Sequence, residues 1–428
     1  MQNSLKNNYL IITASGGSGL LHAAIAQTQM IKNENPNAKI VQKDFMLDWL
    51  GKILGNFGMI AWNKAQKNGR VRFQEILVSF QPILDRLYWF PIFIKALRVL
   101  LKEDIDYVID TQPLGTLAII RAIRVYNKIK KKRVVLRKIL VDLPTKKSTH
   151  FFNPIKKLSK INKEFIIVST IEPLLEKNQR DKDFWEKYCS LDMSKISYDS
   201  YPVRQSFYKL QDKVRERKDY TIKIDCENLK EAAFVEDIAK KGSIDFKKNE
   251  TALEFQIKPD DFVITIILGS QPCFKAMLKY VNLLIEFLQK ENIQKNVKIF
   301  PYCSILRHGL IKKMHNAIMT LDNYPKNLTV IPMSFQKEEV IANLYFRSDF
   351  TITRSAGQTA IELMKVSSAK FCIHTEHSKK ISETSDEKLL TGIPAWEAGI
   401  ARYMKEKMNA ILINPNSFID VFKDSIVN

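Results

Sequence analysis

The sequence predicts an α/β protein made of two Rossmann-like, doubly wound domains that face a cleft. Three observations support this fold class. Short apolar or β-branched runs recur along the chain, helix-length segments separate them, and a second series of such runs begins after a charged stretch. This alternation is typical of a mostly parallel sheet with helices on both faces. A chain of 428 residues, of which 45% are hydrophobic, is long enough for two such domains.

The first series of expected strands lies in an N-terminal domain of residues 1–205: YLIIT (9–13), AKIVQ (38–42), YVID (107–110), RKILVD (137–142) and EFIIVST (164–170). The second series lies in a C-terminal domain of residues 258–412: DFVITIILGS (261–270), NVKIFPYC (296–303), NLTVIP (327–332), FTITRS (350–355), KFCIHT (370–375) and NAILINP (409–415). Between them, the charge-dense residues 206–257 are expected to form an insertion or linker with the order helix, strand, helix. Residues 413–428 are expected to pack back on the first domain.

A glycine-rich loop follows the first expected strand, in TASGGSGLLHAA (13–24). A loop of this kind between a strand and a helix points free backbone N–H groups at a phosphate. The spacing from Gly17 to Gly19 fits the dinucleotide fingerprint, but His22 stands where that fingerprint ends in glycine or alanine. Two interpretations remain open, namely a structural histidine on a core helix and a functional residue at the mouth of a site.

The strongest motif of the second domain is TITRSAGQTAIELM (351–364). A strand ends there, a turn of small polar residues follows, and a helix begins with Glu362 in its first turn. Such a helix start offers unpaired N–H groups and a positive dipole end to a diphosphate, and Arg354 adds a charge. Glu362 can accept hydrogen bonds from two adjacent sugar hydroxyls. The alternative is an ordinary helix whose early glutamate complements the dipole.

Positive charge is concentrated in one part of the chain. The net charge is +21, and residues 121–163 contain fifteen Lys and Arg but one acid, Asp142. Such a segment favours an anionic partner, either a lipid surface or nucleic acid. Nucleic-acid readers that stack bases interleave aromatic residues with the cations, whereas Tyr126 stands alone until Phe151. We therefore expect the anionic partner to be a membrane surface rather than nucleic acid.

The segment FMLDWLGKILGNFGMIAW (45–62) gives the membrane hypothesis independent support. Large apolar residues, including Trp49, Phe57 and Trp62, recur near helical spacing with few charges, as in helices that lie in a bilayer interface. The alternative is packing on the domain's own sheet. No stretch is long and uncharged enough to span a membrane, no secretory signal is recognised, and the five cysteines lack metal spacing. These features predict a cytoplasmic protein associated peripherally with a membrane.

Six segments together resemble one family. They are GGSGLLHAA (16–24), DIDYVIDTQPL (104–114), ILVDLPT (139–145), YPVRQSF (201–207), TRSAGQTAIE (353–362) and GIPAWEAGIARYM (392–404). Their order and spacing resemble the GT-B glycosyltransferases that act on membrane lipids, a group containing the monogalactosyldiacylglycerol synthases and the peptidoglycan N-acetylglucosaminyltransferase. The resemblance covers nearly the whole chain apart from the middle insertion and residues 376–391.

The resemblance implies an inverting transfer of a hexose from a UDP-sugar to a membrane lipid or lipid-linked acceptor, without a metal or other cofactor. His22 would be the catalytic base, with Asp142 as the second candidate. The residues implied in donor binding are Gly269, Ser270, Arg354, Ser355, Ala356, Gly357, Gln358, Thr359, Glu362, Trp396 and Glu397. Those implied in acceptor binding are Gly17, Ser18, Gly19, Gln112, Pro113 and Lys147.

Some positions depart from the family pattern. Trp396 and Ile400 replace an expected glutamine and asparagine, and Lys147 stands where the lipid synthases have histidine. The donor sugar and the acceptor therefore stay open. The alternatives are the same fold acting on a protein or soluble acceptor, an inactive relative that binds lipid or nucleic acid, and a nucleotide dehydrogenase in which Asp44 binds a ribose.

Overall fold

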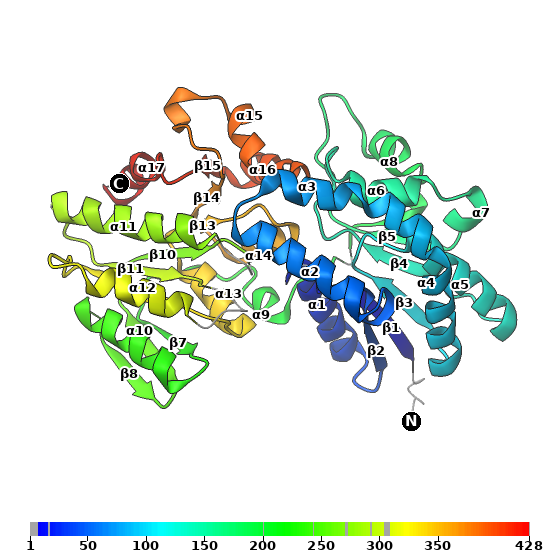
Figure 1. Ribbon diagram of the computed structural model, residues 1–428, viewed down its shortest axis with the longest axis horizontal. Coiled ribbons are helices and arrows are strands. Elements are labelled where there is room, and N and C mark those ends of the chain that lie inside the picture. The colour runs from blue at the N-terminus through cyan, green and yellow to red at the C-terminus, as the bar shows by residue number, and fades with distance from the viewer. Residues whose placement is uncertain are drawn as a thin grey trace.

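The structure is a computed structural model that describes residues 7–15, 18–199, 201–242, 244–269, 273–291, 293–303 and 309–427. Two domains lie side by side, each with a central parallel sheet between layers of helices (Figure 1). Helices α1, α9 and α14 lie at the junction between them (Figure 1). The two doubly wound domains that the sequence predicts are confirmed.

The N-terminal domain contains a six-stranded sheet in the order β2-β1-β3-β4-β5-β6, with every pair parallel. Its strands are β1 (Asn8–Thr13), β2 (Lys39–Asp44), β3 (Tyr107–Asp110), β4 (Leu136–Ile139), β5 (Ile166–Ser169) and β6 (Ile196–Ser197). Its helices are α1 (Ser18–Glu34), η1 (Phe45–Trp49), α2 (Lys52–Lys67), α3 (Val71–Ser79), α4 (Gln81–Glu103), α5 (Thr116–Lys130), α6 (Thr149–Lys156), α7 (Lys160–Lys163), α8 (Asp181–Cys189) and η2 (Met193–Lys195). The short helix α9 (Gln205–Tyr208) follows at the junction.

The C-terminal domain contains a second parallel sheet, in the order β12-β11-β10-β13-β14-β15. Its strands are β10 (Phe262–Ile267), β11 (Val297–Pro301), β12 (Leu328–Val330), β13 (Phe350–Thr353), β14 (Lys370–His374) and β15 (Ile411–Ile413). Its helices are α11 (Phe274–Lys290), α12 (Leu310–Met319), α13 (Glu338–Arg347), α14 (Gly357–Val366), η3 (Ile381–Glu383), α15 (Asp386–Leu389), η4 (Leu390–Gly392), α16 (Ala395–Met408) and α17 (Phe418–Val427).

The strand order places a ligand-binding position in each domain. In an open parallel sheet, ligands bind beyond the carboxyl ends of the strands, where the strand order reverses direction. That point lies between β1 and β3 in the first sheet and between β10 and β13 in the second. The described residues 14–15 and 111–115 therefore belong to one position, and residues 268–269 and 354–356 belong to the other.

Residues 206–257 differ from the expected helix, strand and helix. They include β7 (Tyr220–Asp225), α10 (Leu229–Lys241), β8 (Phe246–Asn249) and β9 (Ala252–Ile257), and the strands form an antiparallel sheet in the order β7-β9-β8. Alternate residues of β7 and β9, such as Ile222, Ile224 and Phe255, are buried in the core of the second domain. A period of two in burial, hidden among many charges, made these strands difficult to recognise.

The last helix also differs from expectation, because α17 packs on the second domain and not on the first. The rings of Phe418 and Phe422 lie against Phe350, and Phe422 also lies against Phe262 and Phe287. Each of these edge-to-face contacts has a ring separation of 5.7–6.1 Å. Phenylalanines spaced four residues apart form one helix face, and the nearest apolar surface is that of β10 and β13.

A buried ion pair supports the loop that follows β3. Lys138 on β4 and Asp110 on β3 are both fully buried, with the Lys138 Nζ 2.6 Å from the Asp110 Oδ2. The same ammonium donates to the Gln112 carbonyl and, at 3.1 Å, to the Thr116 hydroxyl. Burial raises the pKa of the Asp110 carboxyl, and Lys138 opposes that effect. The pair thereby holds the Gln112 turn at the edge of the cleft.

We expect Lys138→Met to lower the free energy of unfolding by about 3–5 kcal/mol, because Asp110 would remain as an unpaired buried charge. Lys146→Met is the matched control, since the Lys146–Glu176 pair spans 2.8 Å but both side chains are 48% exposed. An exposed pair contributes at most about 1 kcal/mol. Urea denaturation measures both values, and equal losses in the two variants would contradict the prediction.

Candidate active site

A cavity of about 290 Å³ lies between the two ligand-binding positions, so that both domains contribute to its walls. The N-terminal wall includes Ser18 and Gly19 at the start of α1, Gln112 and Pro113 after β3, and Asp142 after β4. The C-terminal wall is formed by Gly269, Arg354, Ala356, Gly357, Trp396 and Glu397. Residues from α2, α3 and α4 complete the lining: Gly58, Met59, Trp62, Gln66, Leu77, Val78, Gln81 and Leu84.

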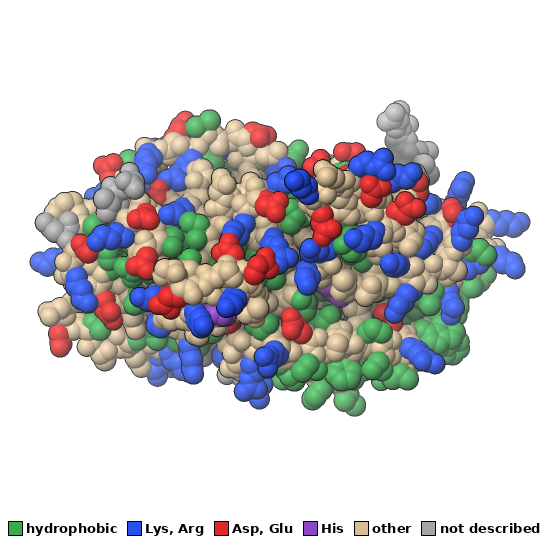
Figure 2. Space-filling view, turned by 90° about the horizontal axis from the view of Figure 1, so that it is seen from above, with side chains coloured by type: hydrophobic (Ala, Val, Ile, Leu, Met, Phe, Trp, Pro, Cys, Tyr) green, Lys and Arg blue, Asp and Glu red, His purple; other side chains and the backbone are tan. Residues whose placement is uncertain are grey.

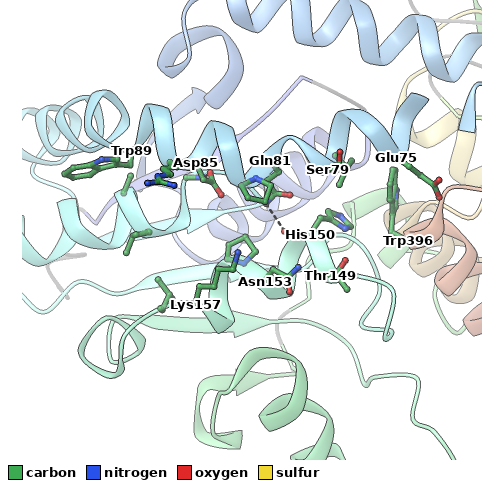
Figure 3. A pocket seen from close by; sticks show the side chains of 18 of the residues that line it. Glu75, Ser79, Gln81, Asp85, Trp89, Thr149, His150, Asn153, Lys157 and Trp396 are labelled. Carbon is green, nitrogen blue, oxygen red and sulfur yellow. Dashed lines mark hydrogen bonds between the residues drawn. The ribbon is translucent and has the colours of Figure 1, made fainter. Parts of the chain in front are cut away.

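One histidine and one aspartate meet in the N-terminal wall. The Nε2 of His150, on α6, lies 2.7 Å from the Oδ2 of Asp142. The Gln81 side chain donates to the His150 carbonyl at 2.9 Å, which fixes the start of α6 (Figure 3). The imidazole also lies against the rings of Phe151 and Trp396. In the tautomer that donates from Nε2 to Asp142, the Nδ1 of His150 keeps a lone pair that can accept a proton.

An arginine and a glutamate meet in the opposite wall. Arg354 follows β13, and its Nη2 lies 2.9 Å from the Oε2 of Glu397 on α16. Burial raises the pKa of the Glu397 carboxyl, with Arg354 opposing and the negative charge of Asp142 adding to the effect. Arg354 is the one Lys or Arg among the described residues that line the cavity. It is therefore the cation available there to an anionic ligand.

The turn of residues 355–359 opens α14 toward the first domain. Its N-cap is Ala356, which supplies no side-chain hydrogen bond to the first-turn N–H groups. A Cβ at Gly357 would collide with the Val141 carbonyl oxygen, so only glycine permits this approach of α14 to β4. Ser355 is buried, and its Oγ has no partner within the described part of the chain. Gln358 donates to the Pro202 carbonyl, while Thr359 is half-buried.

Glu362 does not line the cavity. It is buried, and Arg204 holds its carboxylate at both oxygens, with Nε to Oε1 at 2.6 Å and Nη2 to Oε2 at 2.7 Å. Although burial disfavours the charged guanidinium, Glu362 raises the pKa of Arg204. The expected role of Glu362 in holding a ribose is therefore replaced here by a bidentate ion pair that joins the two domains.

His22 also lies outside the cavity lining, on the second turn of α1. Burial lowers the pKa of its imidazole to about 3, and the nearby charge of Arg204 adds to this effect. The ring is therefore neutral near pH 7 and belongs to the domain junction, where α1 contacts α9 and α14. The structure brings Asp142 into the cavity, as the sequence suggested, but pairs it with His150 and not with His22.

The shifted pKa of His22 predicts a dependence of stability on pH. Between pH 3 and the ordinary value of 6.5, the unfolded chain binds a proton at this histidine that the folded chain does not bind, so the free energy of unfolding falls as the pH falls. From pH 7 to pH 5 this contribution amounts to about 2 kcal/mol. We expect His22→Gln to lose correspondingly less stability over that range in urea titrations. Parallel losses in the two proteins would contradict this assignment.

The remaining predicted residues occupy different places. Lys147 is exposed and lines a neighbouring groove, while Gly17 and Ser270 lie outside the described residues. Trp49 is 2% exposed in the core of the first domain, so it is not a membrane contact, contrary to expectation. Trp62 lines the cavity and stacks on Trp396 with a ring separation of 6.0 Å. Phe57 alone of these three is an exposed apolar residue, at 69%.

Neither a metal-binding cluster nor a membrane-spanning helix is found among the described residues. Within those ranges, no group of three or more His, Cys, Asp or Glu side chains is arranged to hold a metal ion. None of the described helices combines the length and the apolar character that crossing a bilayer requires.

Sequence reasoning missed His150 and Gln81. His150 lies in the segment PTKKSTHFF, where Lys147 drew attention because of the resemblance. A signal was present nonetheless, because a histidine placed eight residues after Asp142 can return to it if a tight turn and a helix intervene. Gln81 carried no such signal, since its role depends on the packing of α4 against α6.

Comparisons with known proteins assign no family to the chain. No protein-family model matches the chain, and no curated protein sequence matches it. Among solved structures, MurG of Acinetobacter baumannii has 10% sequence identity and a TM-score of 0.45, covering 98% of this chain and 90% of that chain. The glycosyltransferase SnogD of Streptomyces nogalater has 10% identity and a TM-score of 0.46, with coverage of 98% and 90%. The UDP-GlcNAc 2-epimerase of Methanocaldococcus jannaschii has 13% identity and a TM-score of 0.43, with coverage of 99% and 93%.

Proposed function

We propose that the protein is a glycosyltransferase that moves a hexose from a UDP-sugar to the hydroxyl of an acceptor held at a membrane surface. The observation that carries this proposal is the arrangement of the interdomain cavity. A histidine–aspartate pair lies in its N-terminal wall, and an arginine and an uncapped helix start lie in its C-terminal wall.

The C-terminal wall suits the diphosphate group of a nucleoside diphosphate. The first-turn N–H groups of α14 have no side-chain cap, and the positive end of the helix dipole favours an anion. Arg354 can form two parallel hydrogen bonds to phosphate oxygens. The unpartnered hydroxyl of Ser355 beside this turn is a further group that a ligand could satisfy. These groups stabilise the diphosphate as negative charge develops on it when the sugar leaves.

The N-terminal wall suits proton removal. With Nε2–H donating to Asp142, the Nδ1 of His150 accepts the proton of an acceptor hydroxyl. The hydroxyl oxygen forms a bond to the anomeric carbon, while the bond from that carbon to the diphosphate oxygen breaks and UDP leaves with the electron pair. The base and the leaving group lie on opposite walls, so a single displacement inverts the anomeric configuration.

An exposed apolar face on α2, α3 and α4 supports the membrane-bound acceptor. Ten large hydrophobic side chains on these helices and at Phe80, which joins α3 to α4, are at least 36% exposed: Ile53, Phe57, Ile60, Phe73, Ile76, Phe80, Ile83, Leu87, Trp89 and Phe90. Figure 2 shows a band of hydrophobic side chains along one edge of the molecule, with Lys and Arg beside it. A contiguous exposed apolar face flanked by cations is typical of a surface that binds a protein or an anionic membrane.

Thermal-shift measurements with UDP, GDP, ADP and NAD test the donor assignment. We expect UDP to raise the melting temperature most, since a ligand that binds only the folded state stabilises it. Product analysis with UDP-hexoses, with and without anionic vesicles, then tests the transfer itself. Stabilisation by NAD alone, or conversion of the sugar without transfer in the presence of vesicles, would overturn the proposal.

A further inference from the structure

A second cavity adjoins the proposed active site and is lined mostly by the N-terminal domain, with Ala395 and Trp396 of α16 at one end. This groove has a volume of about 550 Å³ and runs between α4, α5 and α6. Val78, Gln81, His150 and Trp396 line both the groove and the interdomain cavity, so the two spaces meet at the histidine (Figure 3). The far end of the groove lies at Trp89, which is part of the exposed apolar face.

The acidic side chains of the groove accept hydrogen bonds from backbone N–H groups, whereas its basic side chains are exposed. Glu75 accepts a hydrogen bond from the Ala395 N–H at 3.0 Å, and Asp85 accepts one from the Gly115 N–H at 2.7 Å. Burial also raises the pKa of the Asp85 carboxyl. The four cations are Arg86, Arg121, Lys147 and Lys157, all exposed, and none has an ion-pair partner among the described residues. The groove therefore presents more cations than acids.

The apolar part of the groove lies beside those cations. Trp89, Leu117, Pro154 and Leu158 line it, and the guanidinium of Arg121 lies 4.9 Å from the centre of the Trp89 ring. Trp89 and Arg121 also line a further basic and aromatic depression that extends to Phe90, Phe93 and Phe165. A ligand that extends from His150 toward Trp89 thus meets both cations and an apolar surface.

We propose that this groove binds an anionic phospholipid whose head group carries a free hydroxyl, and that this lipid is the acceptor. The head-group hydroxyl lies at His150, the phosphate diester lies among Arg86, Arg121 and Lys157, and the acyl chains lie along Trp89 toward the exposed face. Such a lipid carries a hydroxyl for the histidine, an anion for the cations and acyl chains for the apolar side chains that line the groove. Its role as acceptor rests on the proposed function, whereas its binding does not.

Binding is tested first, without any sugar transfer. Dihexanoyl phosphatidylglycerol, used below its micelle concentration, is titrated into the protein while the heat of binding and the tryptophan fluorescence, to which Trp89 and Trp396 of the groove contribute, are recorded. We expect Arg86→Gln/Arg121→Gln/Lys157→Gln to weaken binding by about 10- to 100-fold, because charge-assisted hydrogen bonds are lost. The matched control is Lys64→Gln/Arg70→Gln/Arg72→Gln, which removes three exposed cations of α2 and α3 that do not line the groove. We expect it to bind as the wild type does.

Three results would overturn the groove assignment. The first is that dihexanoyl phosphatidylcholine binds as tightly as dihexanoyl phosphatidylglycerol, and the second is that the control variant weakens binding as much as the triple variant does. The third is that glycerol 3-phosphate binds as tightly as the lipid, which would assign the groove to a soluble phosphate ester.

The acceptor role is then tested with vesicles. Phosphatidylglycerol should be glycosylated, whereas phosphatidic acid, which has no head-group hydroxyl, should inhibit without being glycosylated. Binding of phosphatidylglycerol without its glycosylation would uphold the groove and overturn the acceptor role. Transfer to neutral diacylglycerol that the triple variant does not affect would likewise overturn the acceptor role.

Discussion

Replacing His150 by glutamine is expected to reduce the turnover of sugar transfer by about 10²–10⁴-fold, the usual contribution of a positioned general base. Glutamine has a similar size but no group that accepts a proton at neutral pH. The affinity for UDP should change by less than about twofold, because the imidazole lies on the wall opposite Arg354. Steady-state kinetics combined with calorimetric UDP titration separates the two effects.

His22→Gln serves as the control for this experiment, since the sequence alone made His22 the first candidate for the base. Its pKa of about 3 and its place outside the cavity predict turnover close to that of the wild type at pH 7. Asp142→Asn should resemble His150→Gln, because the carboxylate orients the imidazole and stabilises its protonated form. A greater loss of turnover in His22→Gln than in His150→Gln would return the base to the glycine-rich loop.

The strands could be predicted from the sequence because their signal is local. Each of the eleven expected runs overlaps a strand of the structure, from β1 at residues 8–13 to β15 at residues 411–413. Parallel strands buried on both faces appear as continuous apolar runs, as in FVITII of β10. Strand β6 has only two residues, β7 and β9 alternate buried and more exposed side chains, and β8 is mostly polar, so these strands gave no such run.

The partners of polar side chains could not be predicted in the same way, because they depend on distant parts of the chain. Glu362 lies at the expected start of a helix, yet its carboxylate is held by Arg204, which is 158 positions away. No pattern in TRSAGQTAIE indicates that partner. Asp142 drew attention as the one acid of the basic segment, but its partner His150 required knowledge of how α6 turns back.

The helices α2 and α3 connect the membrane hypothesis to the cavity. Their outer faces expose Ile53, Phe57 and Ile76, while their inner faces contribute Trp62 and Val78 to the cavity walls. The same two helices therefore contact both the proposed bilayer and the proposed site. An acceptor that reaches the cavity through the adjoining groove can do so from the bilayer without crossing water, which fits a lipid better than a soluble sugar.

Arg354→Gln is expected to weaken UDP binding by about 10- to 100-fold, the loss that follows removal of one or two charge-assisted hydrogen bonds. Arg354 is the one Lys or Arg among the described lining residues, so no neighbouring cation of this wall compensates for it. Arg354→Lys should show an intermediate affinity, because an ammonium keeps the charge but not the paired donors. Isothermal titration calorimetry measures the affinity for UDP of the wild type and of both variants.

The same substitution also removes the partner of Glu397, whose buried carboxylate would then lack the arginine that offsets its burial. The double variant Arg354→Gln/Glu397→Gln separates the two consequences. It should recover most of the lost folding stability, because no unpaired acid remains, but it should not recover UDP affinity, because the cation is still absent. Recovery of affinity in the double variant would mean that Arg354 acts only by neutralising Glu397, and the diphosphate would then have to be held by α14 alone.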